Sequence, residues 1–241
     1  MGEIRGREEE SYALWEYLES LRPATEEDLV TAAVEAWTLT SACDFRPVQP
    51  DSEIESPFTL LGYIAHNLWE IDIEKVQGLI PRQARDLLEI SLRWADYFLS
   101  PGFRARYAAL PRGFVHGDVH RDNIIVTAGG LKLIDWDNAR IDARLAELTK
   151  PMLCLVEAQR YFERIDRILT AVRRSAHPLN EDEERIWPQV LLMQYVAADI
   201  FGFFLMRTRS YSDDRIRRRF ANSRYLMRPF VDEYGLHSPP K

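Results

Sequence analysis

The segment that most constrains this fold runs from Phe114 to Ala139, where polar loops alternate with two short apolar runs. A polar loop with Asp118 and Asn123 comes first, and the second apolar run leads directly to Asp135. The parts between them are, in order, the apolar run Ile124 to Val126, the turn Gly129-Gly130 and the apolar run Leu131 to Ile134. This pattern predicts a β-hairpin with acidic side chains at its mouth.

Acids and an amide at the mouth of a hairpin suit phosphoryl transfer, in which a protein mainly positions groups and neutralises charge. In such sites one carboxylate accepts the proton of a hydroxyl group, while an amide oxygen and a second carboxylate hold Mg²⁺ on the nucleotide phosphates. Asp118 and Asn123 have the separation of the Asp and Asn in the catalytic loop of kinases, and Asp135 follows on a strand. The spacing therefore favours an ATP- and Mg-dependent phosphotransferase.

Two motifs, His116-Gly117-Asp118 through Asn123 and Ile134-Asp135-Trp136-Asp137, closely resemble the paired motifs of the aminoglycoside phosphotransferase and choline kinase-like family. The resemblance implies a protein kinase-like fold. It also implies one role for each residue: Asp118 as catalytic base, His116 as a brace for the loop, Asn123 and Asp135 as magnesium ligands, and Asp137 as a support behind those ligands. A weaker resemblance, carried by Trp136 to Asp142, is to the spore-coat kinase-like branch.

Turn chemistry offers a structural alternative for the same segment. Asp, Asn and Gly are common turn residues, and a hairpin flanked by acids needs no metal. Turn chemistry does not explain why two apolar strands should carry acids at these separations, so the phosphotransferase interpretation is preferred. For His120 two roles stay open, facing the phosphates or capping the loop.

Composition excludes several classes of protein. The formal net charge of −7 argues against a general nucleic-acid binder, because such affinity depends on a basic surface that neutralises phosphates. Cys43 and Cys154 have no Cys or His nearby at metal-ligand spacing, so no zinc site or disulfide framework is indicated. There is no apolar stretch of the roughly 18 residues that a membrane span needs, and no signal peptide. We therefore expect a cytoplasmic protein that binds neither nucleic acid nor membrane.

Helical periodicity dominates on both sides of the hairpin and predicts a mainly α fold of the α+β class. The predicted helices are Glu9 to Leu21, a helix capped by Thr25 and Asp28, Phe58 to Ile71, Pro81 to Ser100, Ala143 to Arg174 with a kink or break at Pro151, and Val190 to Met206 in a segment that Asn180 caps. The basic run Arg215 to Arg228 is expected to be a solvated face paired with acids.

The N-terminal β lobe of kinase-like enzymes, which grips the nucleotide with a phosphate-covering loop and a lysine, has no clear counterpart here. The only upstream lysine is Lys75, which lies in a sequence typical of a helix edge. We therefore expect an N-terminal helical segment, 1–56, followed by a kinase-like C-terminal lobe, 57–241, without the β lobe. Three explanations stay open: a truncated chain, a lobe supplied by another chain, for example in a homodimer, and a protein that has lost catalysis.

The main functional hypothesis is a phosphotransferase that uses ATP and Mg²⁺ and acts on a hydroxyl of a small molecule. A protein substrate is disfavoured because nothing after Asp135 resembles the activation segment of protein kinases. Acids on the helices after the hairpin would suit a cationic substrate. The alternative is a non-catalytic helical interaction or binding module derived from such an enzyme.

Overall fold

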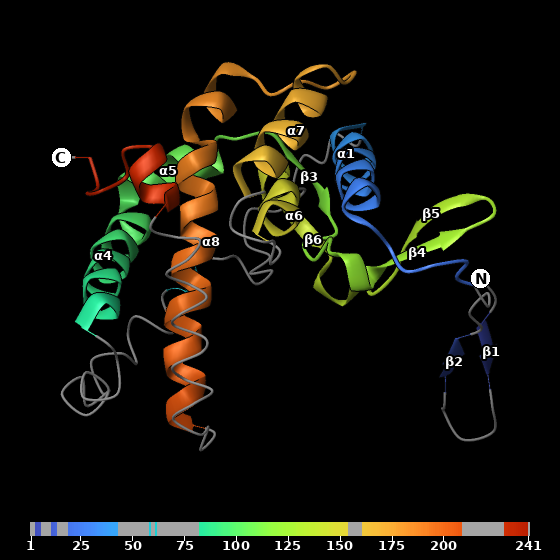
Figure 1. Cartoon of the computed structure of the whole chain (residues 1–241), viewed down its shortest axis with the longest axis horizontal. Helices are drawn as coiled ribbons and strands as arrows, with labels where there is room; N and C mark the ends of the chain where they lie inside the picture. The colour runs from blue at the N-terminus through green and yellow to red at the C-terminus, as the bar shows by residue number, and fades with distance from the viewer. Residues whose placement is uncertain are drawn as a thin grey trace.

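The computed structural model describes residues 3–5, 11–13, 19–42, 58, 61, 82–153, 161–208 and 229–240. In these residues the molecule is mostly helical and contains small antiparallel sheets, each of two strands (Figure 1). The mainly α fold with a β-hairpin, predicted from the sequence, is confirmed.

The strands pair as three hairpins or ribbons. Their bounds are β1 Glu3–Arg5 with β2 Ser11–Ala13, β3 Arg112–Val115 with β6 Arg140–Ala143, and β4 Ile124–Thr127 with β5 Gly130–Leu133. The β4–β5 pair is the predicted hairpin, in register with Val126 opposite Leu131. Gly130 has φ +108°, a backbone conformation that side chains rarely adopt, so the turn needs glycine there.

The predicted helix from Glu9 to Leu21 is wrong, because residues 11–13 form strand β2 and residues 19–22 are not helical. In the β1–β2 register Ile4 lies opposite Tyr12, and on both strands polar or small residues flank this apolar pair. Alternation with a period of two residues therefore prevails over the helical spacing that starts at Tyr12. After β2 the chain runs beside the central hairpin, since the Leu21 amide donates to the Val126 carbonyl at 2.8 Å.

The helices largely follow the sequence pattern. Their bounds are α1 Glu26–Ala42, α4 Arg82–Leu99, α5 Pro101–Ala108, α6 Thr149–Leu153, α7 Tyr161–Arg173 and α8 Glu181–Thr208, with 3₁₀ turns η1 Arg121–Asn123, η2 Trp136–Asn138 and η3 Arg144–Leu148. The predicted helix start at Ala143 is wrong, because Ala143 ends β6 and 144–148 form η3. The predicted kink or break at Pro151 is wrong as well, because Pro151 lies in the first turn of α6, where proline is tolerated. In 58–71 only Phe58 and Leu61 are described, both helical, and 215–228 lies outside the described residues.

Two predicted helix starts are confirmed by reciprocal capping bonds. At α1, the Thr25 amide donates to Asp28 Oδ2 at 2.7 Å and the Asp28 amide donates to Thr25 Oγ1 at 3.3 Å. At α8, the Asn180 amide donates to Glu183 Oε2 and the Glu183 amide donates to Asn180 Oδ1, each at 2.9 Å. Both pairs satisfy amides that a helix leaves without intrahelical partners at its first turn.

The core lies between α4, α8 and the helices beside the central strands (Figure 1). Trp37 of α1 is fully buried there, and its Nε1 donates to the His177 carbonyl at 2.8 Å, so it is a core residue. Helix α1 also packs on β3 and η3, next to the loop that follows β3. None of the described helices combines the length and the apolar composition that a membrane span requires.

Candidate active site

The loop after β3 carries the first motif and is shaped by a close backbone approach. Gly117 has φ +75°, and a Cβ there would lie 2.5 Å from an Arg140 guanidinium nitrogen and 3.0 Å from the Asn138 carbonyl oxygen. Arg140 is placed beside the loop because β6 pairs with β3, with Val115 opposite Arg140. Glycine is therefore required between His116 and Asp118 on grounds of both conformation and space.

His116 links the two motifs. Its ring is buried, with 1% of the residue exposed, and Nε2 lies 2.9 Å from the Ile134 carbonyl oxygen. The Asp118 amide donates to Nδ1 at 3.3 Å, so Nδ1 must be unprotonated and Nε2 must carry the hydrogen that Ile134 accepts. A neutral His116 thus holds the Asp118 loop to the residue just before Asp135, the geometry that a bracing role requires.

Asn123 lies against Asp118. Its Nδ2 donates to the Asp118 carbonyl oxygen at 3.0 Å and approaches Asp118 Oδ2 at 3.4 Å. The Asn123 residue is buried, and its backbone amide donates to the His120 carbonyl at the η1 turn at 2.9 Å. Because the side-chain nitrogen serves Asp118, the Oδ1 oxygen is the atom that Asn123 has left for a cation.

Asp135 follows a doubly anchored residue. Ile134 donates its amide to the Asn123 carbonyl at 3.1 Å and accepts a hydrogen bond from His116. Asp135 itself has φ 62° and ψ 65°, and among the described residues it alone has a positive φ without being glycine. Such left-handed conformations cost energy and gather at functional sites, although Asp tolerates them better than most residues.

Asp137 is less closely tied to the site than the other predicted residues. It is exposed in the η2 turn, and the contact to the loop comes from its neighbour, since Asn138 Nδ2 lies 3.5 Å from Asp118 Oδ2. Hydrogen bonds thus bring together His116, Asp118 and Asn123 and place Asp135 one residue beyond them. The roles of all five predicted residues stay predictions.

Lys150 is a residue of this site that the sequence did not reveal. It lies on α6, and its Nζ is 2.6 Å from Asp118 Oδ1. On the other carboxylate oxygen, His120 Nε2 lies 3.5 Å from Oδ2 and makes no capping bond to η1, so His120 faces the carboxylate. Partial burial raises the pKa of Asp118, but the hydrogen bond and the positive charge of Lys150 outweigh this and leave that pKa below its usual value.

Glu147 of η3 is a second residue that the sequence did not reveal. It is buried, with 1% exposed, and its Oε2 accepts the His116 amide at 2.6 Å and lies 3.1 Å from Thr40 Oγ1. Burial raises the pKa of Glu147, and the hydrogen bond from the His116 amide partly offsets that rise. Glu147 therefore fastens the start of the Asp118 loop to η3, directly ahead of the helix that carries Lys150.

The donor set at the mouth of the hairpin fits magnesium. Mg²⁺ on a nucleotide usually takes one or two protein oxygens, with phosphates and waters completing the shell. The Asn123 amide oxygen and the Asp135 carboxylate supply such a pair. Among the described residues, no group of three or more His, Cys, Asp and Glu side chains is arranged to hold a metal by itself.

The model of the phosphotransferase enzyme family matches residues 4–187. The chain belongs to the phosphotransferase enzyme family. The match begins in β1, upstream of the segment 57–241 to which we assigned the kinase-like resemblance. That domain division stays a prediction.

The similarity to solved structures shows that this chain has a kinase-like fold. A choline/ethanolamine kinase family protein from Mesorhizobium loti matches at a TM-score of 0.59 and 16% identity, over 92% of this chain and 70% of that chain. A choline kinase from Cryptosporidium parvum matches at a TM-score of 0.52 and 13% identity, over 91% of this chain and 71% of that chain. The choline kinase LicA from Streptococcus pneumoniae matches at a TM-score of 0.50 and 14% identity, over 86% of this chain and 68% of that chain. The predicted membership in the phosphotransferase and choline kinase-like group is confirmed.

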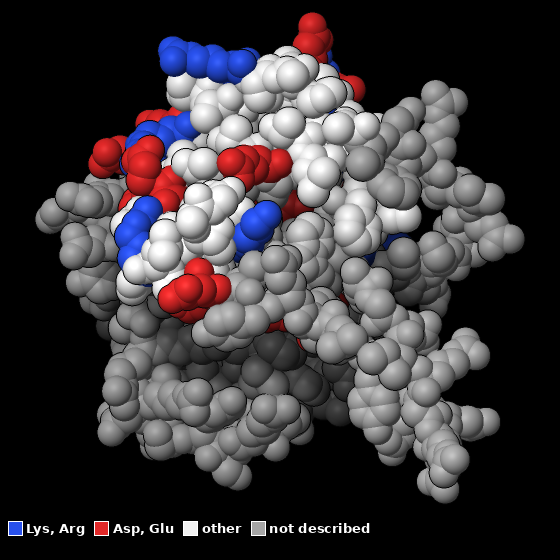
Figure 2. Space-filling view, turned by 90° about the vertical axis from the view of Figure 1, so that its right-hand side faces the viewer, with Lys and Arg blue, Asp and Glu red and all other residues white. Residues whose placement is uncertain are grey.

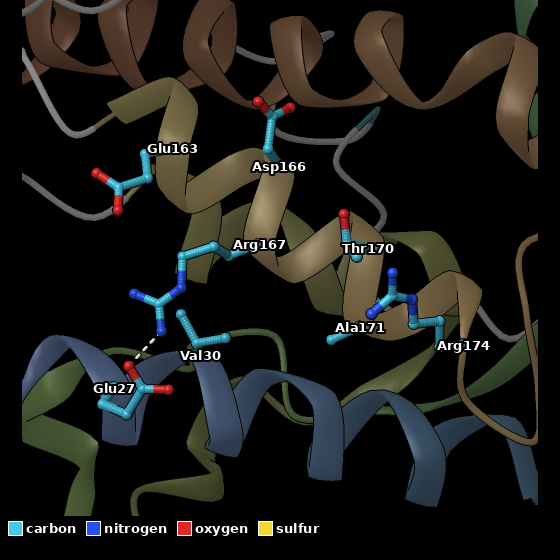
Figure 3. Close-up of a pocket in the computed structure, with 8 residues that line it drawn as sticks. All are labelled: Glu27, Val30, Glu163, Asp166, Arg167, Thr170, Ala171 and Arg174. Atoms are coloured by element: carbon cyan, nitrogen blue, oxygen red, sulfur yellow. Dashed lines mark hydrogen bonds and ion pairs between the residues drawn. The ribbon is translucent and has the colours of Figure 1, made fainter.

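A groove of about 740 Å³ lies away from these motifs, between α1 and α7 (Figure 3). Glu27 of α1 and Arg167 of α7 form an ion pair across it, and none of the predicted site residues lines it. On the face at the right-hand side of Figure 1, Lys and Arg likewise lie among Asp and Glu (Figure 2). Charges of both signs are thus mixed on the described part of this face, whereas the predicted motifs gather at the mouth of the hairpin.

Proposed function

We propose that this chain transfers the terminal phosphoryl group of ATP to a hydroxyl of a small molecule, with Mg²⁺ as cofactor. The observation that carries the proposal is the position of the Asp118 carboxylate. Asn123 Nδ2 lies 3.4 Å from it, Lys150 lies 2.6 Å from it, and the loop is joined through His116 to the residue before Asp135. A base, an amide oxygen and a second carboxylate are the groups that phosphoryl transfer needs at one place.

Asp118 is the group that accepts the proton of the acceptor hydroxyl. Its Oδ2 lies near the side-chain nitrogens of Asn123 and Asn138, which orient the carboxylate. Its pKa below the usual value keeps it ionised at neutral pH. The carboxylate therefore orients the hydroxyl by accepting its hydrogen bond, and takes the proton as the new oxygen–phosphorus bond forms.

Asn123 and Asp135 are the residues that would hold Mg²⁺. The cation supplies neutralisation of charge on the nucleotide phosphates. Asn123 is suited to this because its nitrogen serves Asp118 while its oxygen remains for the cation. The left-handed backbone of Asp135 starts a sharp turn just beyond strand β5, with the Asp135 side chain exposed at the mouth.

Transfer of label from [γ-³²P]ATP in the presence of MgCl₂ tests the proposed function. Choline and ethanolamine are the first acceptors to try, because the structural relatives are named for them; an aminoglycoside and neutral alcohols complete the panel. We expect Asp118→Asn to lower kcat by about 100- to 10,000-fold, the range for loss of a general base. Asp122→Asn is the matched control, because this acid of the same loop has 96% of its side chain exposed.

Label on at least one acceptor with the wild type and with Asp122→Asn, but not with Asp118→Asn, supports the proposal. Equal transfer by the wild type and Asp118→Asn would remove the assigned base. Absence of transfer to every acceptor would instead favour the non-catalytic binding module.

A further inference from the structure

Lys150 is unusual in this chain because lysine is rare. The sequence has only four lysines, Lys75, Lys132, Lys150 and Lys241, whereas arginine supplies the other positive side chains. One of the four lies at the predicted base, with its Nζ 2.6 Å from Asp118 Oδ1. An ammonium group is a compact charge with three donors, suited to oxygens that approach from different directions.

The backbone that carries Lys150 is fixed to the loop that carries Asp118. Glu147, three residues before Lys150, accepts the His116 amide at 2.6 Å, and His116 is two residues before Asp118. Thr149 Oγ1 donates to the Ala146 carbonyl at 2.7 Å, which secures the start of α6. The lysine therefore reaches Asp118 from a short, firmly attached segment.

The two oxygens of Asp118 have different surroundings. Asn123, Asn138 and His120 lie on the Oδ2 side, at 3.4 to 3.5 Å. Lys150 lies on Oδ1, with 44% of its own side chain exposed and 17% of the Asp118 side chain exposed. The ammonium group of Lys150 thus lies on the Oδ1 side of the carboxylate. It has three N–H donors, of which Asp118 Oδ1 accepts one.

A purely structural role explains this arrangement poorly. A partly exposed ion pair typically contributes only about 0 to 1 kcal/mol to stability, and Glu147 already fastens the loop to η3. An ammonium group beside the base does have an electrostatic use in phosphoryl transfer. Negative charge is spread over the oxygens of the transferred group, and donors fixed in advance near those oxygens stabilise the transition state.

We infer that Lys150 is a further catalytic residue, which binds an oxygen of the transferred phosphoryl group while its ammonium group is held on Asp118 Oδ1. It thereby supplies, from α6, a positive charge at the phosphates, the role that a lysine of the N-terminal β lobe has in kinase-like enzymes. No proton leaves the lysine in this step: the hydroxyl proton passes to Asp118, the oxygen–phosphorus bond to the acceptor forms, and the bond to ADP breaks. The inference rests on the proposed phosphotransferase function.

The contact is tested by NMR of the full chain with ¹³Cε-labelled lysine. Four lysines give four signals, and Lys150→Arg identifies the one from Lys150. Addition of MgCl₂ and ATP is expected to shift the Lys150 signal and to leave that of Lys132 unchanged, because Lys132 is an exposed residue of β5, opposite Ile125 of β4. Calorimetric titration of the same sample shows whether ATP binds.

Kinetics provide the second arm. Lys150→Met is expected to lower kcat about 100-fold with the acceptor KM within about threefold, the effect of losing one charge-stabilising donor. Lys150→Arg keeps a positive charge and should retain a larger part of kcat, and Lys132→Met should equal the wild type. Thermal unfolding of each variant shows whether the fold is intact, and Lys150→Gln replaces the methionine variant if that one unfolds.

The outcomes separate the two hypotheses. Heat from ATP binding without a shift of the Lys150 signal overturns the role of Lys150, and so does a kcat for Lys150→Met within about threefold of the wild type. Absence of both ATP heat and phosphate transfer by the wild type defeats the proposed function, and this inference falls with it.

Discussion

The Asp118 loop, together with η3, and the groove between α1 and α7 both contain acidic and basic side chains, but these side chains are held in different ways. In the loop, His116, Asn123 and Glu147 are buried and bonded mainly to backbone groups. In the groove, the Glu27–Arg167 pair has 73% and 35% of its side chains exposed, and it joins two helices across open space (Figure 3). The predicted site thus differs from the groove in the burial and hydrogen bonding of its polar side chains, not in how many charged side chains it contains.

The two regions also differ in how much their contacts contribute to the free energy of unfolding. A buried hydrogen bond to a charged group contributes about 1.5 to 3 kcal/mol, because its loss leaves a desolvated partner unsatisfied. An exposed ion pair contributes about 0 to 1 kcal/mol, since water and salt screen it. Substitutions of the buried residues His116, Asn123 and Glu147 should therefore affect both stability and phosphate transfer, whereas substitutions in the groove should affect neither strongly.

The largest effect on stability is expected for Glu147→Ala. It leaves the buried His116 amide without its acceptor, whereas the Thr40 hydroxyl keeps the Phe114 carbonyl, so the free energy of unfolding should fall by about 1 to 3 kcal/mol. Glu147→Gln keeps an acceptor oxygen and should lose less. Urea denaturation of the three proteins measures this, and equal midpoints for alanine and wild type would show that η3 does not hold the loop.

An intermediate effect is expected for Asp28→Ala at the start of α1, where an exposed ion pair with Arg22 is combined with capping bonds to Thr25. The substitution keeps the bond from the residue-28 amide to Thr25 Oγ1 but removes the acceptor of the Thr25 amide and the pair with Arg22, which should cost about 1 kcal/mol at neutral pH. The hydrogen bond from Arg22, with further bonds from Thr25, lowers the pKa of Asp28, so the carboxylate stabilises the folded state above its unfolded pKa. The difference between wild type and variant should shrink as the pH falls below about 4; a difference that grows on acidification would contradict this.

The smallest effect is expected for Arg167→Ala in the groove. It removes the ion pair with Glu27, and we expect the free energy of unfolding to change by no more than about 0.5 kcal/mol. Phosphate transfer should stay within about twofold of the wild type. A loss of transfer comparable to that of Asp118→Asn would show that the groove takes part in the reaction, and the contrast between the two regions would fail.

Much of the site could be predicted from the sequence because its signals are local. The β4–β5 hairpin follows from two apolar runs around Gly129 and Gly130, and the cap of α8 follows from Asn180. The order and spacing of Asp118, Asn123 and Asp135 lie within one short segment, so a single motif contains them.

The rest depends on contacts between segments far apart in the sequence. Strands β3 and β6 pair across an intervening hairpin, and each is short and carries charged residues, so neither shows a strand pattern. Lys150 and Glu147 belong to a segment with helical periodicity, and only the fold brings them back to the loop after β3. In β1 and β2 a three-residue alternation was too short to be distinguished from a helix by its pattern.

The central claim is that Asn123 and Asp135 hold the metal beside Asp118. Paramagnetic broadening by Mn²⁺ with ATP, observed on the side-chain amide signals of ¹⁵N-labelled protein, tests it most directly. We predict strong broadening of the Asn123 signals in the wild type, much weaker broadening in Asp135→Asn, and none for Asn180, which caps α8. Sharp Asn123 signals under conditions where calorimetry shows that ATP and Mn²⁺ are bound would contradict it.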